Sequence, residues 1–196
     1  MISVKSKRMK AQLILIITTV SIFWIWSGCE EDDRTGPGLI PTSGTATINS
    51  RYVNNQVSGF SFDQAVVVRF PNIAGIFPDI EVFAQINDTG RIVGVFFGRP
   101  DSLLPTFRLL HQFGSIDSAQ SYFQTLGEIP DTTYLDLALF VSANQIWAVK
   151  TRRNNFAKIL IRHTIAYTDS SKPSSPTPYG EATFDWAYQP NGSRQF

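Results

Sequence analysis

The chain has 196 residues, of which 43% are hydrophobic and 13% aromatic, and its formal net charge is +1. After a short leader, this length suits one folded domain with an adequate core. The single cysteine, Cys29, excludes an intrachain disulfide, so the domain has to be stable without one.

Residues 1–28 have the features of a secretory signal peptide. Four basic residues precede any acidic residue, an apolar run covers 11–26, and the small residues Ser27 and Gly28 follow. The alternative is a transmembrane helix that stays in the bilayer, which needs about 20 apolar residues. The run is shorter than that and contains Gln12. We therefore expect residues 1–28 to be removed.

Cys29 ends the stretch Trp26-Ser27-Gly28-Cys29, which resembles the lipobox of bacterial lipoproteins. The resemblance implies that Cys29 is lipidated and becomes the mature N-terminus. Several acyl chains on one residue give stable membrane anchoring. The expected location is the bacterial outer membrane, on its periplasmic or its outer side. A catalytic thiol would need a base in a folded pocket, and nothing near Cys29 suggests one.

Residues 29–43 are expected to form an acidic, Gly- and Pro-rich tether. The run Glu30 to Asp33 resembles the acidic export signal of bacterial surface lipoproteins; a solvated charge run is the alternative. Removing the leader takes four of the 17 basic residues and leaves 13 against 16 acidic ones, a formal charge of about −3. That charge argues against nucleic acid as a partner, because phosphate contacts need a basic face.

Residues 44–196 should form a single β-rich domain, because apolar and polar residues alternate along most of the segment. Residues 79–98 predict a hairpin in which Gly90 supplies the positive φ of the turn. The other expected strands are rich in β-branched and aromatic residues and cover 44–53, 57–62, 64–70, 107–111, 134–140, 144–151, 156–168 and 181–189. The Pro-rich segment 170–180 is expected to be an exposed loop.

One helix interrupts the strands. It is expected to begin at the N-cap Ser115 and to end near Gly127 and Pro130. The predicted fold is therefore all-β with one short α-helix, as a mainly antiparallel meander, sandwich or open barrel.

Catalytic motifs are missing from the sequence: it has no G-x-S-x-G, H-E-x-x-H or C-x-x-C and no phosphate-binding glycine loop. Asp79 and Glu81 share one face of a predicted strand and form a candidate carboxylate pair. Two solvated charges on an outward face are the alternative, and the one we favour.

The two histidines, His111 and His163, are the most informative candidates for a functional site. Stepping by two along the strands places His163 with Ile159 and Ile161, and His111 with Phe107 and Leu109, on apolar faces. Such histidines are usually core or boundary residues. A neutral imidazole in an apolar pocket can also bind haem iron, so both are candidate haem ligands.

Two C-terminal segments resemble HmuY-like lipoproteins: KTRRNNFAKILI, residues 150–161, and EATFDWAYQPNG, residues 181–192. The resemblance implies a β-rich, lipid-anchored domain that captures haem outside the cell. It does not assign His111 or His163, which are candidates from the strand pattern alone.

Phe184, Trp186 and Tyr188 alternate onto one face of the last strand. Aromatic side chains bury large areas, so this stripe is expected to be core. If it were exposed, it would be a contact face for a glycan or a protein.

The predicted function is non-catalytic binding at the cell envelope, with haem or another porphyrin as the one candidate cofactor or ligand. The alternative is a structural or adhesive surface lipoprotein that holds a protein or glycan, and an envelope hydrolase is a third class. Haem capture predicts that His111 and His163 lie on opposite sides of one pocket and that both reach one iron. Adhesion predicts no pocket but an exposed apolar patch. Hydrolysis predicts a nucleophile within hydrogen-bond reach of one histidine.

Overall fold

The computed structural model describes residues 40–53, 56–100, 104–172 and 174–196. The expected leader, Cys29 and most of the tether lie outside the described residues. Residues 40–196 form one compact unit. In the described part of the chain no helix is long and apolar enough to cross a membrane.

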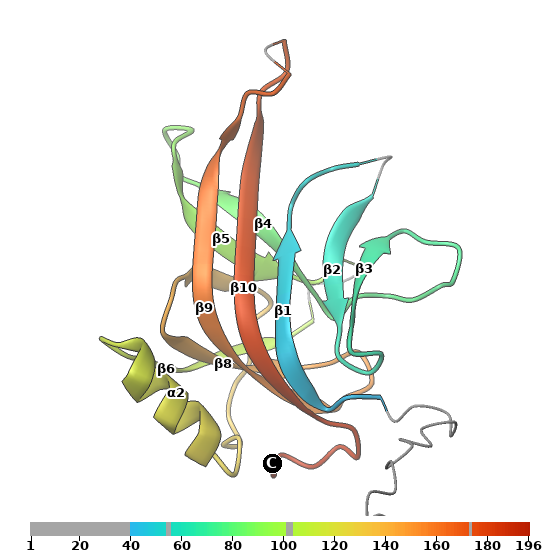
Figure 1. Cartoon of the computed structure of the whole chain (residues 1–196), viewed down its shortest axis with the longest axis vertical. Helices are drawn as coiled ribbons and strands as arrows, with labels where there is room; N and C mark the ends of the chain where they lie inside the picture. The colour runs from blue at the N-terminus through green and yellow to red at the C-terminus, as the bar shows by residue number, and fades with distance from the viewer. Residues whose placement is uncertain (1–39, 54–55, 101–103, 173) are drawn as a thin grey trace, which may run out of the picture. The chain divides into compact units, whose positions relative to one another are not determined.

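Two five-stranded antiparallel sheets make up the domain (Figure 1), which confirms the all-β prediction. The first sheet has the order β1-β10-β9-β8-β6, with strands β1 (Ser43–Asn49), β6 (Phe107–Gln112), β8 (Gln145–Lys150), β9 (Phe156–Asp169) and β10 (Thr177–Gln189). The second has the order β3-β2-β4-β5-β7, with strands β2 (Val57–Ser61), β3 (Val66–Phe70), β4 (Ile80–Ile86), β5 (Ile92–Gly98) and β7 (Ala138–Val141). Gly90 turns the β4–β5 hairpin with φ of 78°, as predicted.

The principal core lies between the sheets because alternate residues of both sheets point inward. Phe184, Trp186 and Tyr188 are all buried in it, which confirms the core interpretation of the aromatic stripe. The ring of Phe60 meets that of Phe184 edge-on at 5.7 Å, and Phe62 stacks on Tyr188 at 6.2 Å. The stripe is therefore no contact face.

The helix α2 (Ile116–Thr125) covers part of the outer face of the first sheet. Its predicted N-cap is confirmed, since Ser115 Oγ accepts a hydrogen bond from the Ser118 backbone N–H at 3.3 Å. Ala119 and Phe123 pack on Ile146 and Leu160 in a second, smaller core. This helix explains why Ile146 of β8 and Leu160 of β9 are apolar although they point outward from the sheet.

Two local expectations were wrong. The expected loop 170–180 overlaps β10, which begins at Thr177 and pairs with the end of β9. The strand extends this far because Gly180 binds Ser50 and because its bare Cα fits against the backbone of β4: a Cβ there would lie 2.7 Å from Ala84 N. Asp79 and Glu81, expected to be solvated, are 4% and 3% exposed, because loops and neighbouring strands cover them.

Candidate functional site

His163 lies on the outer face of the first sheet, so the predicted apolar face for it is wrong. In the pairing of β9 with β10, Ile161 opposes Phe184 and His163 opposes Thr183, which leaves Arg162 as an extra residue. Such a β-bulge reverses the alternation of faces beyond it. Ile161 therefore points into the core, whereas His163 is exposed.

A second β-bulge changes the face from which His111 projects in the same way. On β6, Leu109 opposes Trp147 and His111 opposes Ile146, so that Leu110 is the extra residue. Trp147 belongs to the principal core and Ile146 to the core under α2, on the other face. His111 therefore leaves the face of Leu109 and is exposed on the outer face.

The two bulges place both histidines on the same face of the same sheet. His111 is level with Ile146, which in turn pairs with Leu160, and His163 lies two pleat positions beyond Leu160. With strands about 4.8 Å apart and a rise of about 3.4 Å per residue, the two Cα atoms are roughly 12 Å apart. We call this outer surface between His111 and His163 the histidine ledge.

The ledge has an apolar side at His111. The imidazole meets the ring of Phe113 edge-on, with centroids 4.1 Å apart, and lies 5.7 Å from the ring of Tyr122 on α2. Arg108 is exposed on the outer face of the same strand.

His163 has a polar neighbourhood that is already paired. Arg162 binds the Asp185 carboxylate through Nε at 2.7 Å and through Nη2 at 2.6 Å. On the other side of His163, its neighbour Thr183 shares a hydrogen bond of 2.8 Å with the hydroxyl of Thr47 on β1. Because these neighbouring groups bind one another, we expect a ligand at this position to be contacted by the imidazole of His163.

A hollow of about 610 Å³ lies at the far end of the β9–β10 hairpin. Tyr52, 66% exposed, lines it together with Arg51, Lys172 and Tyr179. Arg51 lies 5.5 Å above the ring of Tyr179 and forms an ion pair of 3.8 Å with Asp169. Burial and the hydrogen bond to Glu181 raise the pKa of the Tyr179 hydroxyl, so this phenol is neutral at ordinary pH. We call it the tyrosine hollow.

A smaller hollow of about 270 Å³ lies near the β8–β9 turn, and Asp79, Phe77, Arg152 and Arg153 line it. Asp79 Oδ2 accepts a hydrogen bond from the Phe62 backbone N–H and Oδ1 accepts one from that of Arg152, each at 2.9 Å. Burial, the largest effect, raises the pKa of Asp79 despite these two donors. Asp79 therefore joins the two sheets, and its carboxylate is engaged in that role.

Neither histidine lines the tyrosine hollow, the hollow at Asp79 or a third one beside Glu128 and Phe156, so none of these three is the expected pocket with a histidine on each side. Within the described residues, no group of three or more His, Cys, Asp or Glu side chains is arranged to hold a metal ion, and neither imidazole is hydrogen-bonded to a hydroxyl nucleophile.

Comparison with known proteins finds no match of any kind. No family model matches the chain, no curated protein matches it, and no solved structure matches its fold. Function therefore has to be argued from the arrangement of these residues.

Proposed function

We propose that the protein is a lipid-anchored, non-catalytic binding protein of the cell envelope that captures haem or a related metalloporphyrin on the histidine ledge. The observation that carries the proposal is the pair of β-bulges, which turn both histidines of the chain onto one exposed face. Membrane attachment through lipid on Cys29 is part of the same proposal.

The separation of the histidines supports ligation of one iron. The two Cα atoms are roughly 12 Å apart, and two metal–nitrogen bonds of about 2 Å take up about 4 Å of that distance. About 4 Å then remains between each Cα atom and its coordinating nitrogen, a distance that a histidine side chain spans. Phe113 and Tyr122 add an apolar, aromatic surface next to His111 for the porphyrin ring. Arg108 supplies an exposed guanidinium on the same face, suited to a propionate.

The test is a haemin titration of the chain from Glu30 to Phe196, followed by absorbance. This form is expected to fold because both cores lie within residues 40–196. We expect a saturable Soret shift that is lost in His111→Ala and in His163→Ala. Tyr52→Ala, in the tyrosine hollow, is the matched control and should leave the titration unchanged.

A featureless titration that is identical in all variants would overturn haem capture. A shift lost only in Tyr52→Ala would move the porphyrin site to the tyrosine hollow, since tyrosine also ligates haem iron.

An adhesive role is the second candidate, and the tyrosine hollow favours it. An exposed tyrosine beside Arg51, Lys172 and several hydroxyls offers a stacking surface together with hydrogen-bonding groups, the combination that a glycan needs. Calorimetric titration with soluble envelope polysaccharides tests it. Binding lost in Tyr52→Ala and kept in His163→Ala would support adhesion, and no heat with any polysaccharide would count against it.

A further inference from the structure

The tyrosine hollow is built on a paired backbone at the far end of the β9–β10 hairpin. The Ser50 N–H donates to the carbonyl of Gly180 at 2.8 Å, and the Ser50 hydroxyl accepts from the Gly180 N–H at 2.8 Å. These two bonds hold the segment that follows β1 against β10. Tyr52 lies two residues further on, and its side chain lines the hollow while remaining 66% exposed. The hollow therefore presents an aromatic ring to a ligand.

Most charged groups in and beside the hollow are already engaged within the domain. Asp169 forms an ion pair of 3.8 Å with Arg51 and accepts a hydrogen bond of 2.9 Å from the Ser171 N–H. The carboxylate of Glu181, which lies beside the lining, accepts a hydrogen bond from the Tyr179 hydroxyl. Arg51 lies over the ring of the same tyrosine. Both carboxylates and this guanidinium are thus taken up by neighbouring groups.

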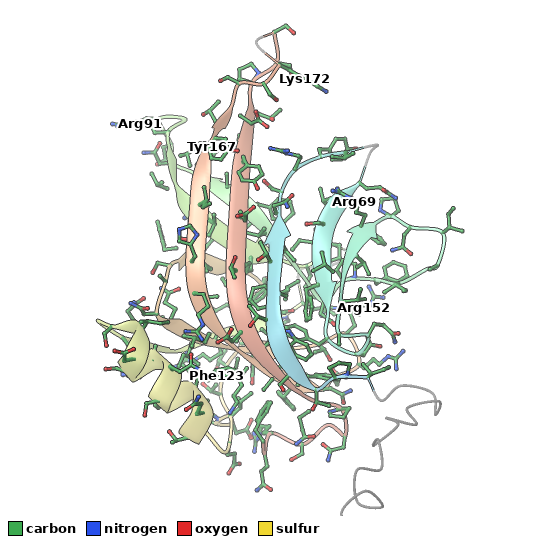
Figure 2. The ribbon with its side chains drawn as sticks, viewed as in Figure 1. Arg69, Arg91, Phe123, Arg152, Tyr167 and Lys172 are labelled. Atoms are coloured by element: carbon green, nitrogen blue, oxygen red, sulfur yellow. The ribbon has the colours of Figure 1, made fainter. Side chains whose placement is uncertain are left out.

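Lys172 is the exception among the charged residues that line the hollow. Figure 2 labels it at the tip of the β9–β10 hairpin. Among the residues that the structure describes, its ammonium has no hydrogen-bond or ion-pair partner. Hydrogen bonding by Ser171 lowers the pKa of Asp169 most, and the charges of Arg51 and Lys172 add to the effect. The two cations and the two carboxylates balance in number, so the hollow is distinguished by an available ammonium and not by net charge.

We propose that the tyrosine hollow binds an acidic sugar, whose ring stacks on Tyr52 and whose carboxylate binds the ammonium of Lys172. The C–H face of a sugar ring packs on an aromatic side chain, and an ammonium–carboxylate contact is a charge-assisted hydrogen bond. The hydroxyls of Ser175 and Thr177 line the same hollow and can bind sugar hydroxyls. Its volume of about 610 Å³ suits a small ligand. The inference rests on the adhesive role proposed above, and it names the class of glycan and the residue that selects it.

The test compares ligands that differ only in charge. Short oligomers of galacturonic, glucuronic and mannuronic acid are each paired with the same oligomer as its methyl ester, and calorimetric titration of the full chain in mild detergent measures binding. We expect at least one acid to bind about tenfold more tightly than its ester, because the ester cannot pair with the ammonium. Added salt should weaken the binding of the acid and leave that of the ester unchanged.

Three substitutions assign this preference to its residues. Lys172→Gln should bring the acid down to the affinity of the ester, whereas Lys172→Arg should keep the preference because it keeps the charge. Tyr52→Ala should weaken both forms alike, since stacking does not depend on the carboxylate. Arg91→Gln, which removes an exposed cation from the turn between β4 and β5, is the matched control and should change neither titration.

Each contrary outcome identifies what fails. Equal affinity for acid and ester, lowered equally by Tyr52→Ala, would overturn the role of Lys172 and leave the adhesive role intact. A preference for the acid that persists in Lys172→Gln would assign the carboxylate to another cation, against the inference. No heat with either form of any oligomer would overturn the inference together with the adhesive role.

Discussion

Replacing Asp79 by alanine should destabilise the domain strongly, because this carboxylate connects the two sheets. It accepts hydrogen bonds from the backbone N–H groups of Phe62, just after β2, and Arg152, in the β8–β9 turn, both at 2.9 Å. Asp79 is 4% exposed, so its removal leaves two poorly hydrated donors. A hydrogen bond to a charged group contributes about 1.5–3 kcal/mol, and part of that is offset here by the desolvation of the carboxylate.

We therefore expect Asp79→Ala to lower the free energy of unfolding by about 3 kcal/mol. For a domain of this size, that loss lowers Tm by roughly 6–12 °C. Urea denaturation followed by circular dichroism measures it. Asp88→Asn, in the exposed β4–β5 turn, is the control and should change stability by less than about 0.5 kcal/mol. A free energy of unfolding for Asp79→Ala that lies within about 0.5 kcal/mol of the wild-type value would refute the reasoning.

The pH dependence gives an independent check on Asp79. Burial raises its pKa above 3.8, so just above pH 3.8 the folded state keeps a proton that the unfolded chain has released. The contribution of Asp79 to stability is then largest below pH 3.8 and falls as pH rises through the folded pKa. Asp79→Asn cannot titrate. The stability of wild type relative to Asp79→Asn should accordingly decrease from acid toward neutral pH, and a difference that rises instead would contradict the burial argument.

Three further substitutions test the packing. Gly180→Ala should lower the free energy of unfolding by about 3 kcal/mol or prevent folding, because the new Cβ would lie 2.7 Å from Ala84 N. Gly114→Ala, with open space around the new Cβ, is the control and should change stability little. Thermal unfolding compares the two variants. Ser115→Ala should cost about 1 kcal/mol through loss of the α2 N-cap, measured by urea denaturation. Burial lowers the pKa of Lys158, so wild-type stability should rise relative to Lys158→Met as pH approaches 10.5, and a flat difference would argue against its burial.

The strand pattern predicted the all-β class, most strand positions and the helix, because each depends on local alternation or capping. The bulges at Leu110 and Arg162 were not predictable in this way. A bulge adds one residue with no compositional signature, yet it changes the face of every residue that follows. A hint was present at Leu160, whose apolar side chain interrupts the alternation in β9 because α2 covers it.

The hollows and the role of Asp79 were out of reach for another reason. The tyrosine hollow joins residues 50–53 to residues 169–179, and Asp79 meets a backbone N–H 73 positions away. Alternation along one strand carries no information about such long-range contacts. The segment 170–180 misled prediction because its prolines suggested a loop, whereas Gly180 allows the strand to begin at Thr177.

The register of β1 relates the start of the described chain to the histidine ledge. Ser43 pairs with Ala187 at the end where the described chain begins, and Thr47 pairs with Thr183, which in turn pairs with His163. Four residues of strand separate these rows, which is about 14 Å. The His163 row of the histidine ledge therefore lies some way along the sheet from the point at which the described chain begins. Lipid attachment at Cys29 and ligand capture on the ledge would use different residues, so each can be tested by substitutions that leave the other intact.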